Sequence, residues 1–156
     1  ERPPGPSYSE QVREMARIPE LQEKYRSLEV SLPIRGEEAV NAGCLLAFQY
    51  DYPDNPAEVV IDTDEFTAVC PWTGLPDYGR LTITYTPNDK CIELKSLKYY
   101  LLEFRNKGIF YEAVTNQILD DLVAACRPRR MTVTGDFAVR GGIKTVVTAR
   151  YEQQTA

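Results

Sequence analysis

A thiol and a carboxyl group stand seven positions apart in the segment Cys70-Pro-Trp-Thr-Gly-Leu-Pro-Asp77. Proline restricts the backbone and glycine admits conformations that other residues avoid, so this composition predicts a short loop of fixed shape. Covalent catalysis needs a polarisable nucleophile beside a group that supplies or removes a proton. Cys70 and Asp77 are therefore candidates for nucleophile and acid. A free cysteine is often only a small buried apolar residue, and that alternative stays open.

Cationic residues form a second candidate site. Lys95 and Lys98 stand three positions apart near the start of an expected helix, and residues at this spacing share a helix face. A helix N-terminus favours anions through its free N–H groups and its dipole. Arg140 and Gly141 fall in an expected turn, where a guanidinium group and an open backbone can approach an anion together. These residues predict a phosphate-binding surface, with a solvated charged face and a plain hairpin turn as the alternatives.

The composition removes several classes of site. The 156-residue chain contains no histidine, which excludes Ser-His-Asp and Cys-His hydrolases and also histidine-ligated zinc. The four cysteines have irregular spacing, so we expect reduced thiols, no metal site and a cytoplasmic location. A net charge of −5 argues against direct nucleic-acid binding. No apolar run has the length of a membrane span, and we expect no membrane partner.

The hydrophobic pattern predicts elements that hold these residues in place. Alternating apolar and polar residues predict strands, the first of them largely buried, over residues 44–50, 58–62, 80–85, 131–137 and 143–151. Apolar residues at three- and four-residue steps predict helices over residues 93–106 and 114–126. Two consecutive helices between strands indicate an antiparallel sheet with helices on one face, an α+β fold.

The first part of the chain is expected to be peripheral. Residues 1–40 carry prolines and charge, with short helices predicted to end near Ala16 and Arg26. We expect residues 41–156 to form a single domain.

The candidate motifs gain specificity from their order and spacing. Cys70-Pro-Trp-Thr-Gly-Leu-Pro-Asp77 is followed by Glu93-Leu-Lys-Ser-Leu-Lys-Tyr-Tyr100, then by Glu112 and by Arg140-Gly-Gly142. This set resembles the NADPH-dependent 7-cyano-7-deazaguanine reductases, the QueF family of nitrile reductases in queuosine biosynthesis, a tRNA modification pathway. The resemblance covers residues 62–151. It implies the tunnelling fold (T-fold), which assembles into rings with active sites between subunits.

The resemblance also implies roles for individual residues. Cys70 would attack the nitrile carbon to form a covalent thioimide, and Asp77 would give the nitrogen its proton. Two hydrides from NADPH would then yield 7-aminomethyl-7-deazaguanine. The residues implied to bind the substrate are Ile92, Glu93, Leu94, Tyr111 and Glu112. Those implied to bind the cofactor are Leu94, Lys95, Lys98, Arg140 and Gly141.

Tyr111 departs from the family pattern, in which a histidine precedes the matching glutamate. Tyrosine donates a hydrogen bond but does not titrate near neutral pH, so proton delivery by that histidine does not carry over. The resemblance further implies a homo-oligomer, with two stacked pentamers as one arrangement.

Two other functions stay open. One is an amidinotransferase like the archaeosine synthases, which keep the cysteine and the aspartate but act on nitrile-bearing tRNA. The other is a non-catalytic ring protein that binds a purine or a pterin. Lys95, Lys98 and Arg140 favour the reductase, because the amidinotransferases lack the cofactor motif.

Overall fold

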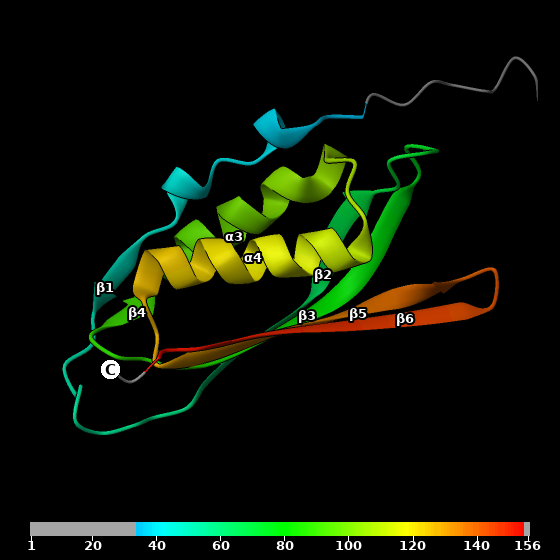
Figure 1. Cartoon of the computed structure of the whole chain (residues 1–156). Coiled ribbons are helices and arrows are strands. Elements are labelled where there is room, and N and C mark those ends of the chain that lie inside the picture. Colours follow the sequence, from blue (N-terminus) through cyan, green and yellow to red (C-terminus); the bar gives the residue numbers. More distant parts are fainter. Residues whose placement is uncertain (1–33, 155–156) are drawn as a thin grey trace, which may run out of the picture. The chain divides into compact units, whose positions relative to one another are not determined.

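The computed structural model describes residues 34–154, and the helices expected near Ala16 and Arg26 lie outside this range (Figure 1). With 3-10 helices written η, the elements in chain order are η1 (Glu37–Ala39), η2 (Ala42–Cys44), β1 (Ala47–Gln49), β2 (Val59–Val69), β3 (Pro76–Thr86), β4 (Lys90–Ile92), α3 (Leu94–Leu102), η3 (Glu103–Asn106), α4 (Tyr111–Cys126), β5 (Arg130–Arg140) and β6 (Ile143–Glu152).

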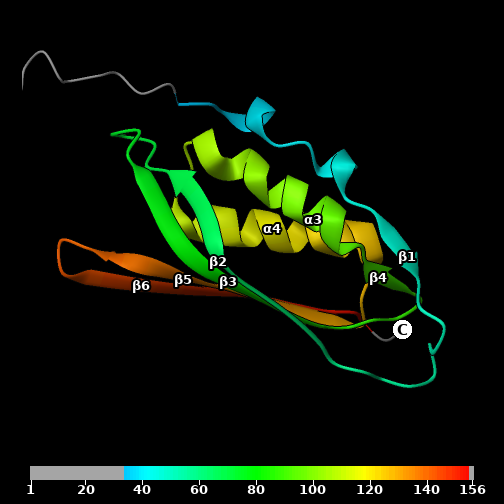
Figure 2. The ribbon, with the colours of Figure 1, turned by 180° about the vertical axis from the view of Figure 1, so that it is seen from behind.

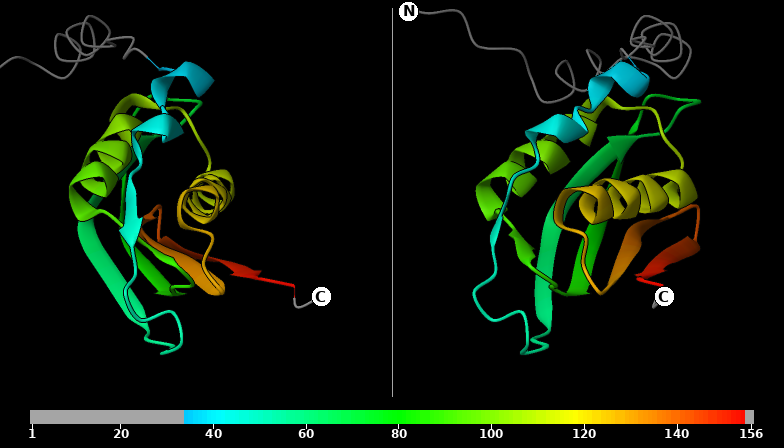
Figure 3. Two further views of the ribbon diagram at one scale, coloured as in Figure 1. Left: turned by 90° about the vertical axis from the view of Figure 1, so that its left-hand side faces the viewer. Right: turned by 60° about the vertical axis from the view of Figure 1, so that its left-hand side comes forward.

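Four long strands form an antiparallel sheet in the order β2-β3-β5-β6. Both α-helices lie on the same face of this sheet, as Figures 1 and 2 show. Figure 3 shows α4 running along the β5–β6 side, with α3 on the β2 side. The architecture confirms the predicted α+β class, the antiparallel sheet and the two consecutive helices.

Strand β3 shows how the sequence sets this arrangement. From Pro76 to Tyr85, buried residues alternate with exposed or partly buried ones. The buried set is Asp77, Gly79, Leu81, Ile83 and Tyr85. Successive strand residues point to opposite faces, so this set lies on one face of the sheet, where its apolar members join the core. Asp77 is the first residue of the row and stands at its edge.

A side-chain cap explains where α3 begins, and a left-handed backbone conformation explains where α4 ends. The Glu93 carboxylate caps α3 by accepting from the backbone N–H groups of Lys95 and Ser96 at 2.8 and 2.7 Å. Helix α4 ends at Arg127, which takes the left-handed conformation with φ 46° just before Pro128. The predicted 93–106 helix is confirmed, and its last turn is the 3-10 helix η3.

The prediction for residues 44–50 is wrong. Only Ala47–Gln49 are a strand, and Leu46 and Phe48 are 59% and 55% exposed. Among residues 34–154, this strand pairs only with the three-residue β4, for which the sequence showed no signal. The two strands form a separate sheet from the main one. Alternation in this segment therefore does not reflect burial.

Three chain segments meet at one end of the main sheet. The β2–β3 loop, residues 70–75, lies beside the η3–α4 connection, because Val69 forms a parallel bridge with Gly108. The β5–β6 turn reaches the same end, where Arg140 pairs with Asp77.

Among the helices of residues 34–154, none is long and apolar enough to cross a membrane.

Candidate active site

The loop that carries Cys70 is closed by its own backbone. The Cys70 N–H donates to the Leu75 carbonyl at 2.9 Å, and the Gly74 N–H donates to the Cys70 carbonyl at 2.8 Å. Gly74 has φ +69°, a conformation that side-chain-bearing residues rarely adopt. The loop therefore has the fixed shape that its prolines and glycine predict, with the Cys70 thiol partly exposed.

The environment of Cys70 favours its thiolate form. The Thr73 side chain and the backbone N–H groups of Thr73 and Trp72 lower the pKa of Cys70 to about 7, against an opposing effect of burial. The Arg140 guanidinium makes a smaller contribution in the same direction. A cysteine with ordinary pKa is only a few per cent ionised near neutral pH. A pKa of about 7 leaves a large fraction of Cys70 ionised near neutral pH, which favours a reactive thiol over a chemically inert one.

Replacing Thr73 by valine should raise the pKa of Cys70, because the isosteric side chain cannot donate to the thiolate. The rate of Cys70 alkylation by iodoacetamide, measured by mass spectrometry across pH, should rise through a midpoint near pH 7 in the unaltered chain. In Thr73→Val this midpoint should move to higher pH. Thr148→Val, which removes a hydroxyl from exposed strand β6, should leave it in place. An unchanged midpoint in Thr73→Val would show that Thr73 does not tune the thiol.

Asp77 lies in the same corner and is 6% exposed. The Tyr111 hydroxyl donates to Asp77 Oδ1 at 3.0 Å, and Arg140 Nη1 contacts the same oxygen at 2.5 Å. The Thr67 hydroxyl donates to the Asp77 backbone carbonyl at 2.8 Å. Cys70 and Asp77 therefore share a neighbour in Arg140, a contact that the sequence motifs did not predict.

A buried lysine ties this corner to the helices, although sequence reasoning did not single it out. The Lys107 ammonium lies 2.8 Å from Gln117 Oε1 and 3.1 Å from Glu37 Oε2. Its backbone carbonyl accepts from the Val69 N–H at 3.0 Å, and Val69 directly precedes Cys70. A lysine in a polar, non-periodic stretch looks solvent-exposed in a sequence, so no local signal identifies it.

Gly108 explains how closely these segments pack. A Cβ atom at Gly108 would stand 3.3 Å from Pro71 Cα and 2.4 Å from the Ile34 side chain. The absence of a side chain thus lets the η3–α4 connection lie directly against the Cys70 loop.

The structure divides the remaining predicted site residues into two groups. Tyr111 and Glu112 open α4 at the Cys70 end, with the Glu112 side chain exposed. Ile92 lies at the other end, where its N–H donates to the Tyr85 hydroxyl at 3.1 Å. Tyr85 is eight residues beyond Asp77 on β3, roughly 26 Å of extended strand. Glu93 and Leu94 follow Ile92 directly, so one copy of the chain does not bring them to Cys70.

The two lysines lie on α3. Both Lys95 and Lys98 are exposed, and no carboxylate of residues 34–154 pairs with either. Lys98 and Leu94 line a groove of about 340 Å³ between α3 and the edge strand β2. No cluster of three or more potential metal ligands occurs within residues 34–154.

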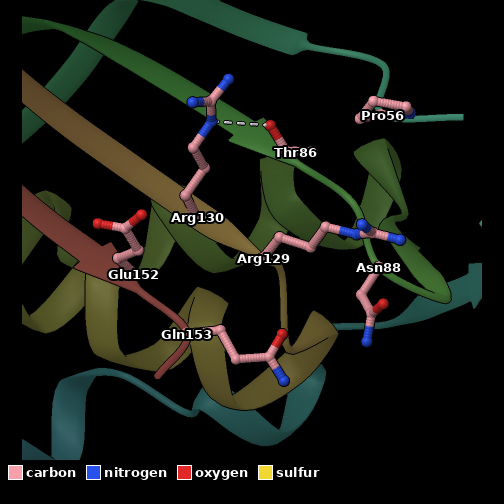
Figure 4. Close-up of a pocket in the computed structure, with 7 residues that line it drawn as sticks. All are labelled: Pro56, Thr86, Asn88, Arg129, Arg130, Glu152 and Gln153. Carbon is pink, nitrogen blue, oxygen red and sulfur yellow. Dashed lines mark hydrogen bonds between the residues drawn. The ribbon is translucent and has the colours of Figure 1, made fainter. Parts of the chain in front are cut away.

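A larger open pocket of about 620 Å³ lies away from Cys70 (Figure 4). It is lined by the far ends of β3, β5 and β6, where Arg130 Nε donates to Thr86 Oγ1 at 3.1 Å. Arg129 is held by the Pro53 carbonyl at 2.5 Å. The residues that line this pocket include no cysteine, and the pocket lies at the end of the sheet opposite Cys70. The volume of a pocket is therefore not enough to identify the reactive site.

Comparison with known proteins places the chain in a family. The family model described as QueF-like protein matches residues 76–156. The NADPH-dependent 7-cyano-7-deazaguanine reductase of Chlorobaculum tepidum is 56% identical over 114 residues, which is 73% of this chain and 97% of the relative. The protein of that name from Caldanaerobacter subterraneus is 48% identical over 134 residues, 86% of this chain and 98% of the relative.

A solved structure shows the same fold. The apo crystal structure of the archaeosine synthase QueF-Like superposes with a TM-score of 0.59 at 22% identity, over 65% of this chain and 99% of that chain. At this identity the likeness establishes the fold alone, and it agrees with the T-fold that the sequence predicts. Together the family model and the reductase relatives establish that this chain belongs to the QueF family.

Proposed function

We propose that this protein is an NADPH-dependent nitrile reductase that converts 7-cyano-7-deazaguanine to 7-aminomethyl-7-deazaguanine in queuosine biosynthesis. The observation that carries the proposal is the pairing of a thiol of lowered pKa, Cys70, with a buried carboxylate, Asp77, through Arg140. A nitrile carbon is a modest electrophile, and a thiolate is a stronger nucleophile toward it than a hydroxyl group. The relatives that carry this activity in their names match nearly their full length.

The protein's residues divide the chemistry between them. Cys70 sulfur forms a bond to the nitrile carbon while one carbon–nitrogen π bond opens toward nitrogen. Asp77 passes the proton that Cys70 gives up to that nitrogen, so a neutral thioimide results and the carboxylate is regenerated. NADPH, when bound, supplies the two hydrides that complete the reduction. Cys70 leaves as a thiolate after the first reduction and takes up a proton from solvent before another cycle.

Residues of α4 are suited to hold the substrate ring. The exposed Glu112 carboxylate offers two acceptor oxygens that complement the N–H edge of a deazaguanine. Glu112 directly follows Tyr111, whose hydroxyl donates a hydrogen bond to Asp77. This placement supports ring recognition by Glu112 at the end of the site that holds Cys70.

The cationic residues fit a dinucleotide cofactor to different degrees. Lys95 and Lys98 are exposed without a carboxylate partner in residues 34–154, which suits them to phosphate groups. Arg140 already pairs with Asp77, and Gly141 lies beside it with φ +56° and open space around its Cα. The two lysines are therefore the better-supported cofactor residues.

We further propose that the active site is completed by a second copy of the chain. The Ile92 N–H donates to the hydroxyl of Tyr85, which stands roughly 26 Å along β3 from Asp77. Glu93 and Leu94 follow Ile92 directly, so one small substrate does not contact both groups within a single copy of the chain. Within residues 34–154, strands β2 and β6 are the two edges of the main sheet, and unpaired edges favour pairing with neighbouring chains. A ring built through these edges would join the two groups, and sedimentation analysis measures the number of copies.

The two alternatives are less favoured. The archaeosine synthase shares the fold at 22% identity, whereas the named reductases share up to 57% identity with this chain. A non-catalytic binding protein has no need of a cysteine with a pKa of about 7 beside a buried carboxylate.

Neutralising the lysines should weaken cofactor binding. Lys95→Gln or Lys98→Gln should raise the KM for NADPH by about tenfold, the scale of a lost hydrogen bond to a charged group, with little change in kcat. Steady-state rates at varied NADPH measure both constants. Lys90→Gln on β4 removes the same charge from an exposed position and serves as the control. Equal KM values in all three variants would remove the lysines from the cofactor site.

Covalent trapping tests the proposed function. Without NADPH, intact mass spectrometry should detect a protein species heavier by the mass of 7-cyano-7-deazaguanine. Addition of NADPH should return the protein to its original mass and release the aminomethyl product. An adduct that persists with NADPH present would point to nitrile chemistry other than reduction.

A further inference from the structure

One oxygen of Asp77 receives both of its side-chain contacts. The Tyr111 hydroxyl and Arg140 Nη1 lie 3.0 and 2.5 Å from Oδ1, respectively. Within residues 34–154 no hydrogen bond reaches Oδ2. Both oxygens of an ionised carboxylate are acceptors, so Oδ2 retains its lone pairs for a proton while Oδ1 is occupied.

The ring of Tyr111 is fixed in place by an aromatic contact with Phe137. Its ring stacks on Phe137 with centroids 4.0 Å apart and an interplanar angle of 14°. A Cβ atom at Gly79 or Gly135 would stand 2.8 or 2.7 Å from the Phe137 ring, so these two glycines provide the space that the ring fills. A tyrosine at the start of α4 is thereby fixed against β3 and β5, and its hydroxyl has a defined position.

The two donors also keep their protons across the physiological range. Burial and the neighbouring Asp77 carboxylate raise the pKa of Tyr111, although Arg140 opposes this shift. Tyr111 and Asp77 raise the pKa of Arg140 above its ordinary value. Neither group competes with Asp77 as a proton carrier, so their chemistry suits them to hold the carboxylate.

We propose that Tyr111 and Arg140 are positioning residues that clamp Oδ1 of Asp77, so that Oδ2 carries the proton between Cys70 and the nitrile nitrogen. The inference rests on the proposed function. Oδ2 takes the proton from the Cys70 sulfur, the sulfur lone pair forms the bond to carbon, and one π pair moves to nitrogen. The nitrogen then takes the proton from Oδ2. Asp77 begins and ends as a carboxylate paired with Arg140, so that ion pair does not conflict with its acting as an acid.

Tyr111→Phe is the sharpest test, because it removes one hydroxyl and keeps the ring on Phe137. Adduct formation between the protein and 7-cyano-7-deazaguanine, followed by rapid-quench mass spectrometry without NADPH, isolates the proton transfer from cofactor binding. We expect the rate at saturating nitrile to fall about tenfold, the scale of one hydrogen bond to a charged group. The nitrile concentration at half-maximal rate should stay within about twofold. The solvent deuterium isotope effect should increase, because proton transfer limits the rate more strongly.

Two further variants separate positioning from a structural role. Tyr111→His restores a donor and should recover most of the lost rate above pH 7. Tyr151→Phe removes a hydroxyl from β6 and should react as the unaltered chain does. A Tyr111→Phe variant that forms the adduct at the original rate, or whose isotope effect does not change, overturns the proposal.

The clamp can also be measured without catalysis. Tyr111→Phe should lower the urea midpoint of unfolding in the unaltered background but not in an Asp77→Ala background, where no carboxylate is left to receive the hydroxyl. Equal shifts in both backgrounds overturn the clamp. If the unaltered chain forms no adduct, both the proposed function and the catalytic part of this proposal are wrong. The unfolding comparison then still shows whether Tyr111 stabilises the protein through Asp77.

Discussion

Replacing Cys70 by alanine is expected to abolish nitrile reduction, lowering kcat by roughly 10⁴-fold or more, the scale of losing a covalent nucleophile. The reason is specific to the loop, which presents a partly exposed thiol of pKa about 7. Alanine keeps the backbone bonds between residues 70, 74 and 75, because both use main-chain atoms. The loss of activity is therefore attributed to removal of the sulfur atom rather than to a change in the loop. Nitrile-dependent NADPH oxidation measures it.

Substrate binding should survive this substitution. Trp72 is the single tryptophan of the chain, is 83% exposed and stands two positions from Cys70, so its fluorescence reports on ligands at this loop. Cys70→Ala should still show a nitrile-dependent fluorescence change. Cys44→Ala removes another partly exposed free thiol and should keep full activity. Comparable turnover in Cys70→Ala and Cys44→Ala would rule out Cys70 as the nucleophile.

Asp77→Asn should lower kcat by about 10²- to 10⁴-fold, the range for loss of a general acid. The amide keeps an oxygen that can accept from Tyr111 and Arg140, so the local contacts survive while the proton carrier is lost. The KM for the nitrile should change little, because Asp77 is assigned to the proton and Glu112 to the ring. Steady-state kinetics at saturating NADPH separate the two constants.

A matched control is available for Asp77→Asn. Asp136 lies on β5, is about half exposed and pairs with Lys144. Asp136→Asn makes the same chemical change outside the Cys70 corner and should leave kcat unaltered. A fall of equal size in both variants would indicate a general charge effect rather than proton transfer by Asp77.

Much of the fold was predictable because its signals are local. Alternation over residues 80–85 and 131–137 predicted the two central strands, and the three- and four-residue period predicted both helices. The strand at residues 44–50 failed because alternation cannot show whether another layer covers a face. Leu46 and Phe48 alternate correctly yet remain exposed.

The sequence motifs suggested candidate site residues but not how these residues are arranged in space. Cys70 and Asp77 are close in sequence, so the loop that joins them could be inferred. Arg140 is 63 positions from Asp77, and only the strand order brings the β5–β6 turn onto that carboxylate. From its motif alone, Arg140 was expected to bind only the cofactor. In the same way, Ile92, Glu93 and Leu94 look near Asp77 in the chain but lie at the far end of β3.

The most direct test of the central claim is the stoichiometry of NADPH oxidation with 7-cyano-7-deazaguanine. Reduction of a nitrile to an amine needs two hydrides, so we expect two NADPH consumed for each 7-aminomethyl-7-deazaguanine formed, and none without the nitrile. Absorbance of the nicotinamide and chromatography of the product give both numbers. No nitrile-dependent NADPH oxidation by folded protein would contradict the account.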